Sequence, residues 1–228
     1  MHRLSTKYDI KGDDRVALIV AALTSNIIDS TTSRDDLLSY YDNLIGTSFK
    51  LSAKLCRDTT MITFYAKQIA SFVAQQQANC KSVDDLVKEF TNAVNNDSAS
   101  RLMLGKWLRE VQTLYKPALL LASVMFTKGN EFANEELKNV YLPCSSQEPL
   151  LSGEILCDVF EKNDFLKIMN MKTILTGQEI AKELGVNPGK IIGEVVSALI
   201  DWQIVHGKET REDALHWLHA NKTTWVKQ

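Results

Sequence analysis

Apolar residues recur at helical spacing along nearly the whole chain, from residue 13 to residue 220. A period of 3.6 residues gathers such residues on one face of an α-helix, whereas a half-buried strand alternates with a period of two. Only four prolines and ten glycines occur, which is few for an all-β fold of 228 residues. We therefore predict an all-α protein, with an irregular multi-helix body over residues 1–172 and a small helical tail over residues 173–228.

Several expected helices of the body carry recognisable start signals. Ser33 and Ser82 each precede a segment with aspartates in its first turn. A serine hydroxyl can accept a hydrogen bond from a first-turn amide, and the helix dipole stabilises carboxylates there. The apolar run 16–23 predicts a buried helix, and the polar stretches 75–79 and 95–98 predict short loops. A further predicted helix has an apolar face formed by Met61, Ile62, Tyr65, Ile69, Phe72 and Val73.

The segment 101–116 is amphipathic when it is drawn as one helix. Apolar residues cover one side, and the other side carries four cations, Arg101, Lys106, Arg109 and Lys116. A solvated basic face is one interpretation, because surface lysines and arginines need no partner. A nucleic-acid surface is the other, in which the cations contact phosphates and position the nucleic acid without reading its sequence.

Residues 174–193 predict a short helix, a tight turn and a second helix. Thr176 and Glu179 have the spacing of a capping box, in which each residue satisfies a backbone amide of the other. Gly185 is placed to end the short helix in a left-handed conformation, which other residues adopt only at a cost.

The start of the second helix has features that attract anions. Pro188 suits a first turn, and the amides from Gly189 onward are then left unpaired beside Lys190. Amides and a cation at a helix start form a candidate phosphate site. The alternative is a tight corner between two helices with a solvated lysine.

The long helix after this turn is expected to be a core element that directs Lys190 away from the buried side. We expect its tryptophan, Trp202, to pack in the core and not to stack on a base. The residues expected to turn inward are Ile191, Ile192, Val195, Val196, Leu199, Ile200 and Trp202.

Composition narrows the classes of function. The net charge of −2 argues against indiscriminate nucleic-acid binding, so any nucleic-acid surface must be a local patch. The four cysteines form no C-x-x-C pair, which favours neither a metal site nor a disulfide framework. The longest apolar run, 118–126, is far shorter than the roughly 20 residues of a membrane span, and no signal peptide is visible. We expect a soluble intracellular protein without metal ligands or membrane contact.

The tail resembles one known family. The motifs Leu-Thr-Gly-Gln-Glu-Ile, Asn-Pro-Gly-Lys-Ile-Ile-Gly, Ile-Asp-Trp-Gln and Thr-Arg-Glu-Asp-Ala-Leu occur in the order found in the C-terminal tail of CCA-adding tRNA nucleotidyltransferases of the eukaryotic and bacterial class, class II. Segments 17–23, 49–58 and 100–109 are more weakly similar to helices of that family's body. Residues 128–172 resemble no part of the family.

The resemblance implies that the chain is the C-terminal body and tail of such an enzyme, of fungal or other eukaryotic origin. Its partners would be tRNA, held at the acceptor stem and elbow, and an N-terminal catalytic head. Mg²⁺, CTP and ATP would be needed by that head and not by this chain. The family implies the cytoplasm, nucleus or mitochondrion as the compartment. The implied RNA-binding residues are Arg101, Lys106, Arg109, Lys116, Gly189 and Lys190.

Catalytic residues are not predicted in this chain. In the family, an Asp-x-Asp pair follows a Gly-Gly segment and holds the divalent ions, but this sequence has no Gly-Gly. The aspartate pairs at 13–14, 35–36 and 84–85 each precede an expected helix and are typical of its first turn. Walker and Rossmann glycine motifs are also absent. We assign no catalytic residue and no metal ligand, and expect the chain to be inactive alone.

Two alternatives remain open. The first is an all-helical protein-interaction module without nucleic-acid function, which an apolar surface groove without a basic stripe would favour. The second is a regulatory enzyme domain, which would need a pocket with converging polar groups.

Overall fold

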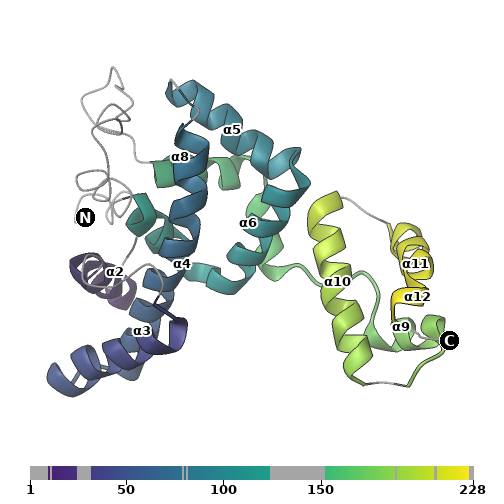
Figure 1. Ribbon diagram of the computed structural model, residues 1–228, viewed down its shortest axis with the longest axis horizontal. Coiled ribbons are helices and arrows are strands. Elements are labelled where there is room, and N and C mark those ends of the chain that lie inside the picture. The colour runs from purple at the N-terminus through teal and green to yellow at the C-terminus, as the bar shows by residue number, and fades with distance from the viewer. Residues whose placement is uncertain are drawn as a thin grey trace. The chain divides into compact units, whose positions relative to one another are not determined.

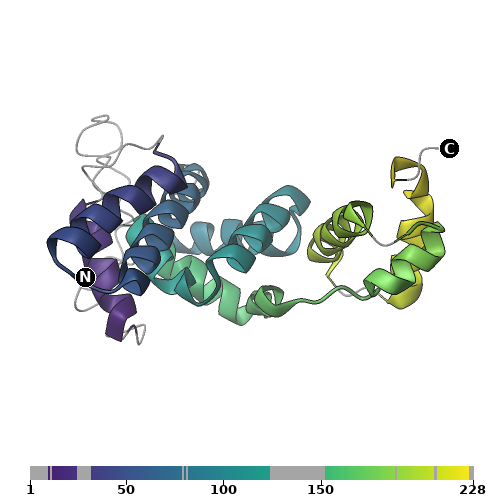
Figure 2. The same ribbon diagram turned by 90° about the horizontal axis from the view of Figure 1, so that it is seen from below.

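The computed structural model describes residues 10, 12–24, 32–78, 80, 82–123, 152–187, 189–207 and 210–225. Within these ranges the regular structure is helical, with no strand, as Figures 1 and 2 show. The predicted all-α fold is therefore confirmed. Pro188 and most of the unassigned stretch 128–172 lie outside the described residues.

The chain divides into two compact units. Unit 1 comprises Met1–Asn92 and Glu110–Asp164, and unit 2 comprises Ala93–Arg109 and Phe165–Gln228. Each unit thus combines two segments that are distant in sequence. The boundary expected between residues 172 and 173 stays a prediction.

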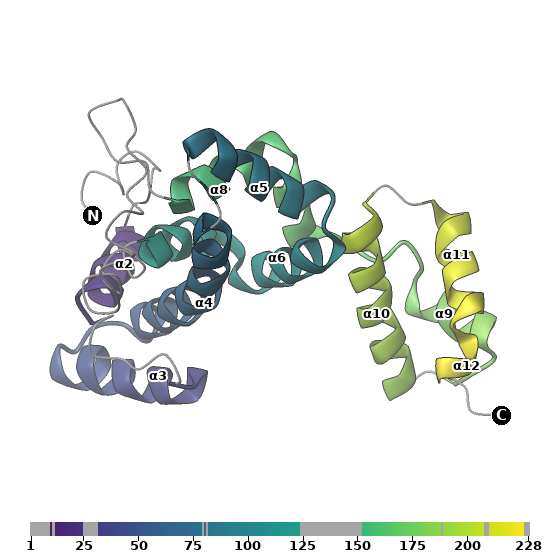
Figure 3. The same ribbon diagram turned by 45° about the horizontal axis from the view of Figure 1, so that its top comes forward.

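Unit 1 is organised around its longest helix, α4 (Ala53–Ala78), shown in Figure 3. The helices α2 (Gly12–Thr24) and α3 (Arg34–Tyr41) both pack against α4. A π-helical turn, η1 (Asp42–Ser48), follows α3 directly. The hydroxyl of Ser33 accepts a hydrogen bond from the amide of Asp36, so the predicted cap of α3 is confirmed.

The predicted apolar face of α4 is largely confirmed. Its fully or nearly buried members are Ile62, Tyr65, Ile69, Phe72 and Val73. Met61 is only partly buried. The loop expected at 75–79 is wrong for residues 75–78, because α4 continues to Ala78.

The helix expected at 16–23 is present as part of α2, but only one of its faces is buried. Ala17, Leu18 and Ala21 are fully buried, whereas Val16 and Leu23 are 44% and 75% exposed. The predicted burial is therefore confirmed for one face of the helix and wrong for the face that carries Val16 and Leu23. The buried face is the one that packs on α4.

A buried chain of hydroxyl groups links the three packed helices. The Thr24 hydroxyl lies 2.6 Å from the Tyr41 hydroxyl, which lies 3.0 Å from the hydroxyl of Thr63. Burial raises the pKa of Tyr41 above its ordinary value. Satisfied polar groups in a core fix the mutual register of the elements that carry them.

Each of the next two helices has residues in both units. α5 (Val83–Asn95) begins after Ser82, whose hydroxyl accepts a hydrogen bond from the amide of Asp85, and α6 (Ser98–Val111) follows after the predicted break. A 3-10 turn, η2 (Gln112–Leu114), then precedes a helix over 115–123. α8 (Ser152–Lys162) contacts that helix in unit 1, where the amide of Gly153 donates to the hydroxyl of Ser123 at 2.7 Å.

The continuous helix expected over 101–116 is wrong at its C-terminal end. Gln112 has a left-handed backbone with φ of 52°, and η2 separates α6 from the following helix. Lys116 therefore lies on a different helix from Arg101, Lys106 and Arg109. A helical wheel assumes an unbroken helix, so it could not detect this.

Unit 2 contains the tail helices around their own core. After η4 (Phe165–Asn170) come α9 (Gly177–Leu184), α10 (Lys190–His206), α11 (Arg211–Ala220) and α12 (Lys222–Trp225). Burial of a leucine or isoleucine contributes about 1.5–3 kcal/mol before the entropic cost of ordering it, so such a core can hold short helices together. The buried core residues are Leu175, Ile180, Leu184, Val195, Leu199, Ala214 and Leu218.

The predicted inward face of α10 is confirmed in part. Val195 and Leu199 are fully buried, and Trp202 packs partly buried against the tail core, as expected. Ile191 is 40% exposed, so its predicted inward position is wrong. It lies in the first turn of α10, and the next residue, Ile192, packs against the tail core instead.

Candidate nucleic-acid interface

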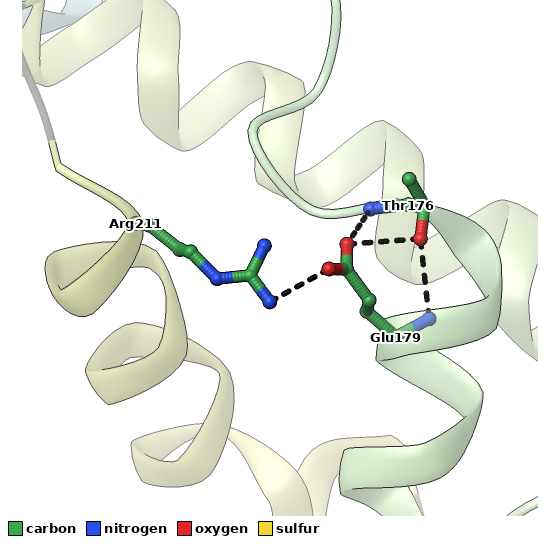
Figure 4. Close-up of polar contacts among 3 residues, drawn as sticks. All are labelled: Thr176, Glu179 and Arg211. Carbon is green, nitrogen blue, oxygen red and sulfur yellow. Dashed lines mark hydrogen bonds and ion pairs between the residues drawn. The ribbon is translucent and has the colours of Figure 1, made fainter.

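The start of α9 has the predicted capping box (Figure 4). The amide of Glu179 donates to the Thr176 hydroxyl at 3.3 Å, and the amide of Thr176 donates to a Glu179 carboxylate oxygen at 2.7 Å. At the other end, Gly185 has φ of 72° and ψ of 33°, the predicted left-handed conformation. The first helix and its stop signal are therefore confirmed.

Glu179 has a second role that local sequence patterns did not indicate. Its other carboxylate oxygen lies 2.6 Å from the guanidinium of Arg211, as Figure 4 shows. The hydrogen bond from Arg211, together with those from Thr176, lowers the pKa of Glu179 to about 2. The contact ties the start of α11 to the start of α9 within unit 2.

Arg211 is placed by a second capping box. The Thr210 hydroxyl accepts from the amide of Asp213 at 3.2 Å, and the Thr210 amide donates to the Asp213 carboxylate at 2.9 Å. This fixes Arg211 as the first residue of α11. This cap was not predicted, although the Thr-x-x-Asp spacing at 210–213 could have indicated it; the partner of Arg211 could not have been inferred from that spacing.

The start of α10 presents the predicted lysine to solvent. Lys190 is the first residue of the helix, its side chain is 91% exposed, and its ammonium group lies 3.7 Å from the Glu194 carboxylate. Gly189 is the N-cap and, among the described residues, no side chain caps this helix start. First-turn amides without a side-chain acceptor carry partial positive charge toward solvent or a ligand.

A hollow of about 370 Å³ lies between the starts of α9 and α10. Three of its lining residues are glycines, and most of the surface exposed in the hollow is apolar. Sequence patterns had singled out Gly189 but not the other two glycines of the lining. The lining residues are Thr176, Gly177, Gln178, Gly189, Ile192 and Gly193.

The two arginines of the expected basic face are bound to backbone carbonyl groups of unit 2. Arg101 donates to the carbonyl oxygens of Val94 and Ile204. Arg109 donates to those of Ile168 at 3.1 Å and Met171 at 2.7 Å. These bonds hold each guanidinium against its own chain.

The two lysines of the same set are each paired with a carboxylate. Lys106 lies 2.6 Å from Asp201 in unit 2, and Lys116 lies 3.1 Å from Glu161 in unit 1. Exposed pairs of this kind contribute about 0–1 kcal/mol, so a phosphate could displace the carboxylate. RNA binding by Arg101, Lys106, Arg109 and Lys116 stays a prediction, and the structure does not gather them on one helix.

The aspartate pairs that resemble metal-binding motifs lie in first helical turns, as expected. Those at 13–14, 35–36 and 84–85 begin α2, α3 and α5. Within the described part of the chain, no three side chains of His, Cys, Asp or Glu converge on a possible metal position. The described helices also include none with the length and hydropathy that crossing a membrane requires.

Comparison with known proteins gives one distant similarity. The chain is 23% identical over 155 residues to the tRNA nucleotidyltransferase cca2 of Schizosaccharomyces pombe. The match covers 68% of this chain and 29% of that protein. No family model matches the sequence, and no solved structure matches it. The similarity indicates a distant relation to a fungal tRNA nucleotidyltransferase.

Proposed function

We propose that this chain is the tRNA-binding C-terminal body and tail of a class II CCA tRNA nucleotidyltransferase. The observation that carries the proposal is the similarity to the fungal enzyme over 68% of the chain. The tail supports the C-terminal placement, because a short helix, a turn, the long helix α10 and the charged helix α11 follow one another in the order that the family resemblance implies.

The tRNA contact is proposed at the start of α10. The Lys190 side chain is 91% exposed, and its ammonium group lies 3.7 Å from the carboxylate of Glu194, one turn later on the same helix. Ion pairs of this kind contribute about 0.3–0.5 kcal/mol. A backbone phosphate can therefore replace the carboxylate at little cost. No side chain of the described residues caps this helix start, so its first-turn amides would donate to the same phosphate.

The remaining parts of the proposal concern the parent enzyme. A catalytic head elsewhere in that protein would bind Mg²⁺, CTP and ATP and add the CCA end, while these helices hold the acceptor stem and elbow. The parent would then act in the cytoplasm, nucleus or mitochondrion, where tRNA is processed. This chain alone should incorporate no labelled CTP or ATP into tRNA.

The test is tRNA binding by the purified chain, measured by fluorescence anisotropy with a tRNA that lacks its CCA end. Lys190→Glu places a repelling charge at the site and should weaken binding on the order of tenfold or more. Because the side chain is exposed, the free energy of unfolding should change by at most about 0.5 kcal/mol.

Lys88→Glu is the matched control. Lys88 is an exposed lysine of α5 in unit 1, and its replacement makes the same change in net charge. It should leave most of the affinity intact. Equal losses in the two variants, or no binding by the wild-type chain at low salt, would overturn the proposal.

One observation favours the alternative of a protein-interaction module. Val16, Ile19 and Leu23 form an exposed apolar stripe along α2, and an exposed stripe of this kind often marks a protein contact. That function predicts no tRNA binding at any salt concentration. The anisotropy measurement therefore separates the two candidates.

A further inference from the structure

The end of α10 is held by an arginine from another helix of unit 2. Arg101 on α6 donates through Nε to the carbonyl of Ile204 and through Nη1 to the carbonyl of Val94. Its guanidinium also lies 5.3 Å from the centre of the Phe165 ring. One side chain thus joins the end of α5, the last turn of α10 and the start of η4.

Arginine suits this position for physical reasons. The last carbonyl groups of a helix have no partner within the helix and carry partial negative charge, and a nearby cation stabilises them. A planar guanidinium can donate to two carbonyl oxygens in fixed directions, which an ammonium group on a flexible stem cannot reproduce. α10 ends at His206, and the residue that caps it, Gly207, has φ of 89°.

The close approach of α6 and α10 depends on a glycine. A Cβ atom added to Gly105 would meet the Ile204 side chain at 2.6 Å, which is too short for any real contact. Gly105 therefore lets the backbone of α6 reach the last turn of α10. Arg101, one turn earlier on α6, can then reach the Ile204 carbonyl.

We infer that Arg101 is a positioning residue, which sets the direction of α10 and so places the Lys190 turn, and that it does not contact RNA. The second half of this inference rests on the proposed function. α10 has 17 residues and is therefore about 25 Å long. A tilt of about 10° at its C-terminal end would move Lys190 by about 4 Å, which is more than the length of a hydrogen bond.

The experiment compares Arg101→Lys and Arg101→Gln with Lys190→Gln, by tRNA anisotropy over a range of salt concentrations. Arg101→Lys keeps the charge but loses the planar fork, so both Arg101 variants should weaken binding by a similar factor, on the order of tenfold. Their slope of log affinity against log salt should equal that of the wild type. Lys190→Gln should lower the slope by roughly 0.7–0.9, the value for one lost phosphate contact.

A second variant disturbs the same contact without touching a charge. Gly105→Ala must push Ile204 aside, so it should weaken tRNA binding with an unchanged salt slope, as the Arg101 variants do. The inference is wrong if Arg101→Lys binds tRNA as tightly as the wild type does while the salt slope of Arg101→Gln falls by roughly 0.7–0.9, the value for one lost phosphate contact. Arg101 would then be an RNA ligand.

Hydrogen exchange tests the positioning role without RNA. In the wild type, the amide of Gly207 donates to the Gln203 carbonyl at 2.9 Å. Exchange at the last turn of α10 should be on the order of tenfold faster in Arg101→Lys and unchanged in Lys190→Gln. Unchanged exchange in Arg101→Lys would overturn the inference even if tRNA binds. Faster exchange in a chain that binds no tRNA would support the positioning of α10 and contradict only the proposed function.

Discussion

Two glycines of the tail should respond in opposite directions to the same substitution. Gly185 ends α9 with φ of 72°, whereas Gly193 lies inside α10, and an added Cβ would meet nothing within 4 Å at either position. Steric clashes are therefore excluded for both. Only the backbone conformation distinguishes Gly185→Ala from Gly193→Ala.

The magnitudes follow from that difference. An L-residue in the left-handed helical region costs about 1–2 kcal/mol, and the lower entropy of the unfolded chain returns about 0.4–1 kcal/mol. Gly185→Ala should therefore destabilise unit 2 by about 1 kcal/mol. Gly193→Ala removes the cost of glycine in a helix and should stabilise the unit by about 0.5–1 kcal/mol.

Tryptophan fluorescence measures this unit selectively. The four tryptophans of the chain are Trp107, Trp202, Trp217 and Trp225, and all belong to unit 2. For a unit of about 80 residues, a urea dependence near 1 kcal/mol per M is expected, so Gly185→Ala should lower the unfolding midpoint by about 1 M. Gly193→Ala should raise it by about 0.5–1 M.

The result that refutes this reasoning is a midpoint for Gly185→Ala equal to or above that of the wild type. A left-handed residue at the end of α9 would then be excluded. A urea midpoint of Gly193→Ala below that of the wild type would instead show that the added methyl group collides with neighbouring atoms.

Two further predictions concern the tail. Glu179 has a folded-state pKa of about 2 against an ordinary value of 4.5, so its hydrogen bonds stabilise the fold above pH 4.5 and this contribution is lost as the pH falls toward 2. The difference in urea midpoint between the wild type and Glu179→Gln should shrink over this range, and a constant difference would contradict the assigned contacts. Leu199→Ala leaves a cavity at a fully buried position, so it should lower the free energy of unfolding of unit 2, followed by tryptophan fluorescence, by about 2–5 kcal/mol. Leu23→Ala is the control: Leu23 is 75% exposed and lies in unit 1, so this variant should leave the tryptophan-detected transition unchanged. A small loss for Leu199→Ala would mean that the tail core is not packed as described.

The features that the sequence predicted well are those with local causes. A capping box joins residues three positions apart, and a glycine stop depends on a single backbone conformation, so Thr176, Glu179 and Gly185 were assigned correctly. The periodicity of α4 was equally informative about its buried face, since that pattern repeats over many turns.

The features that were missed depend on residues far away in the chain. One of the two carbonyl partners of Arg101, that of Ile204, is 103 positions distant, and those of Arg109 are 59 and 62 positions distant. A helical wheel shows these arginines on a polar face but contains no information about which groups meet that face. The break at Gln112 was missed for a related reason, because nothing in the apolar pattern requires the backbone to change direction there.

The composition of unit 2 from two separate segments has a consequence for the order of folding. Ala93–Arg109 leaves the ribosome long before Phe165–Gln228, so the bonds of Arg101 and Arg109 to carbonyl groups of the later segment cannot form until most of the chain has been made. Closing the intervening loop of about 55 flexible residues would cost about 3–4 kcal/mol in chain entropy. Helices that have already formed within 110–123 and 152–164 would shorten the flexible part of that loop and lower this cost, so unit 2 should complete its core last.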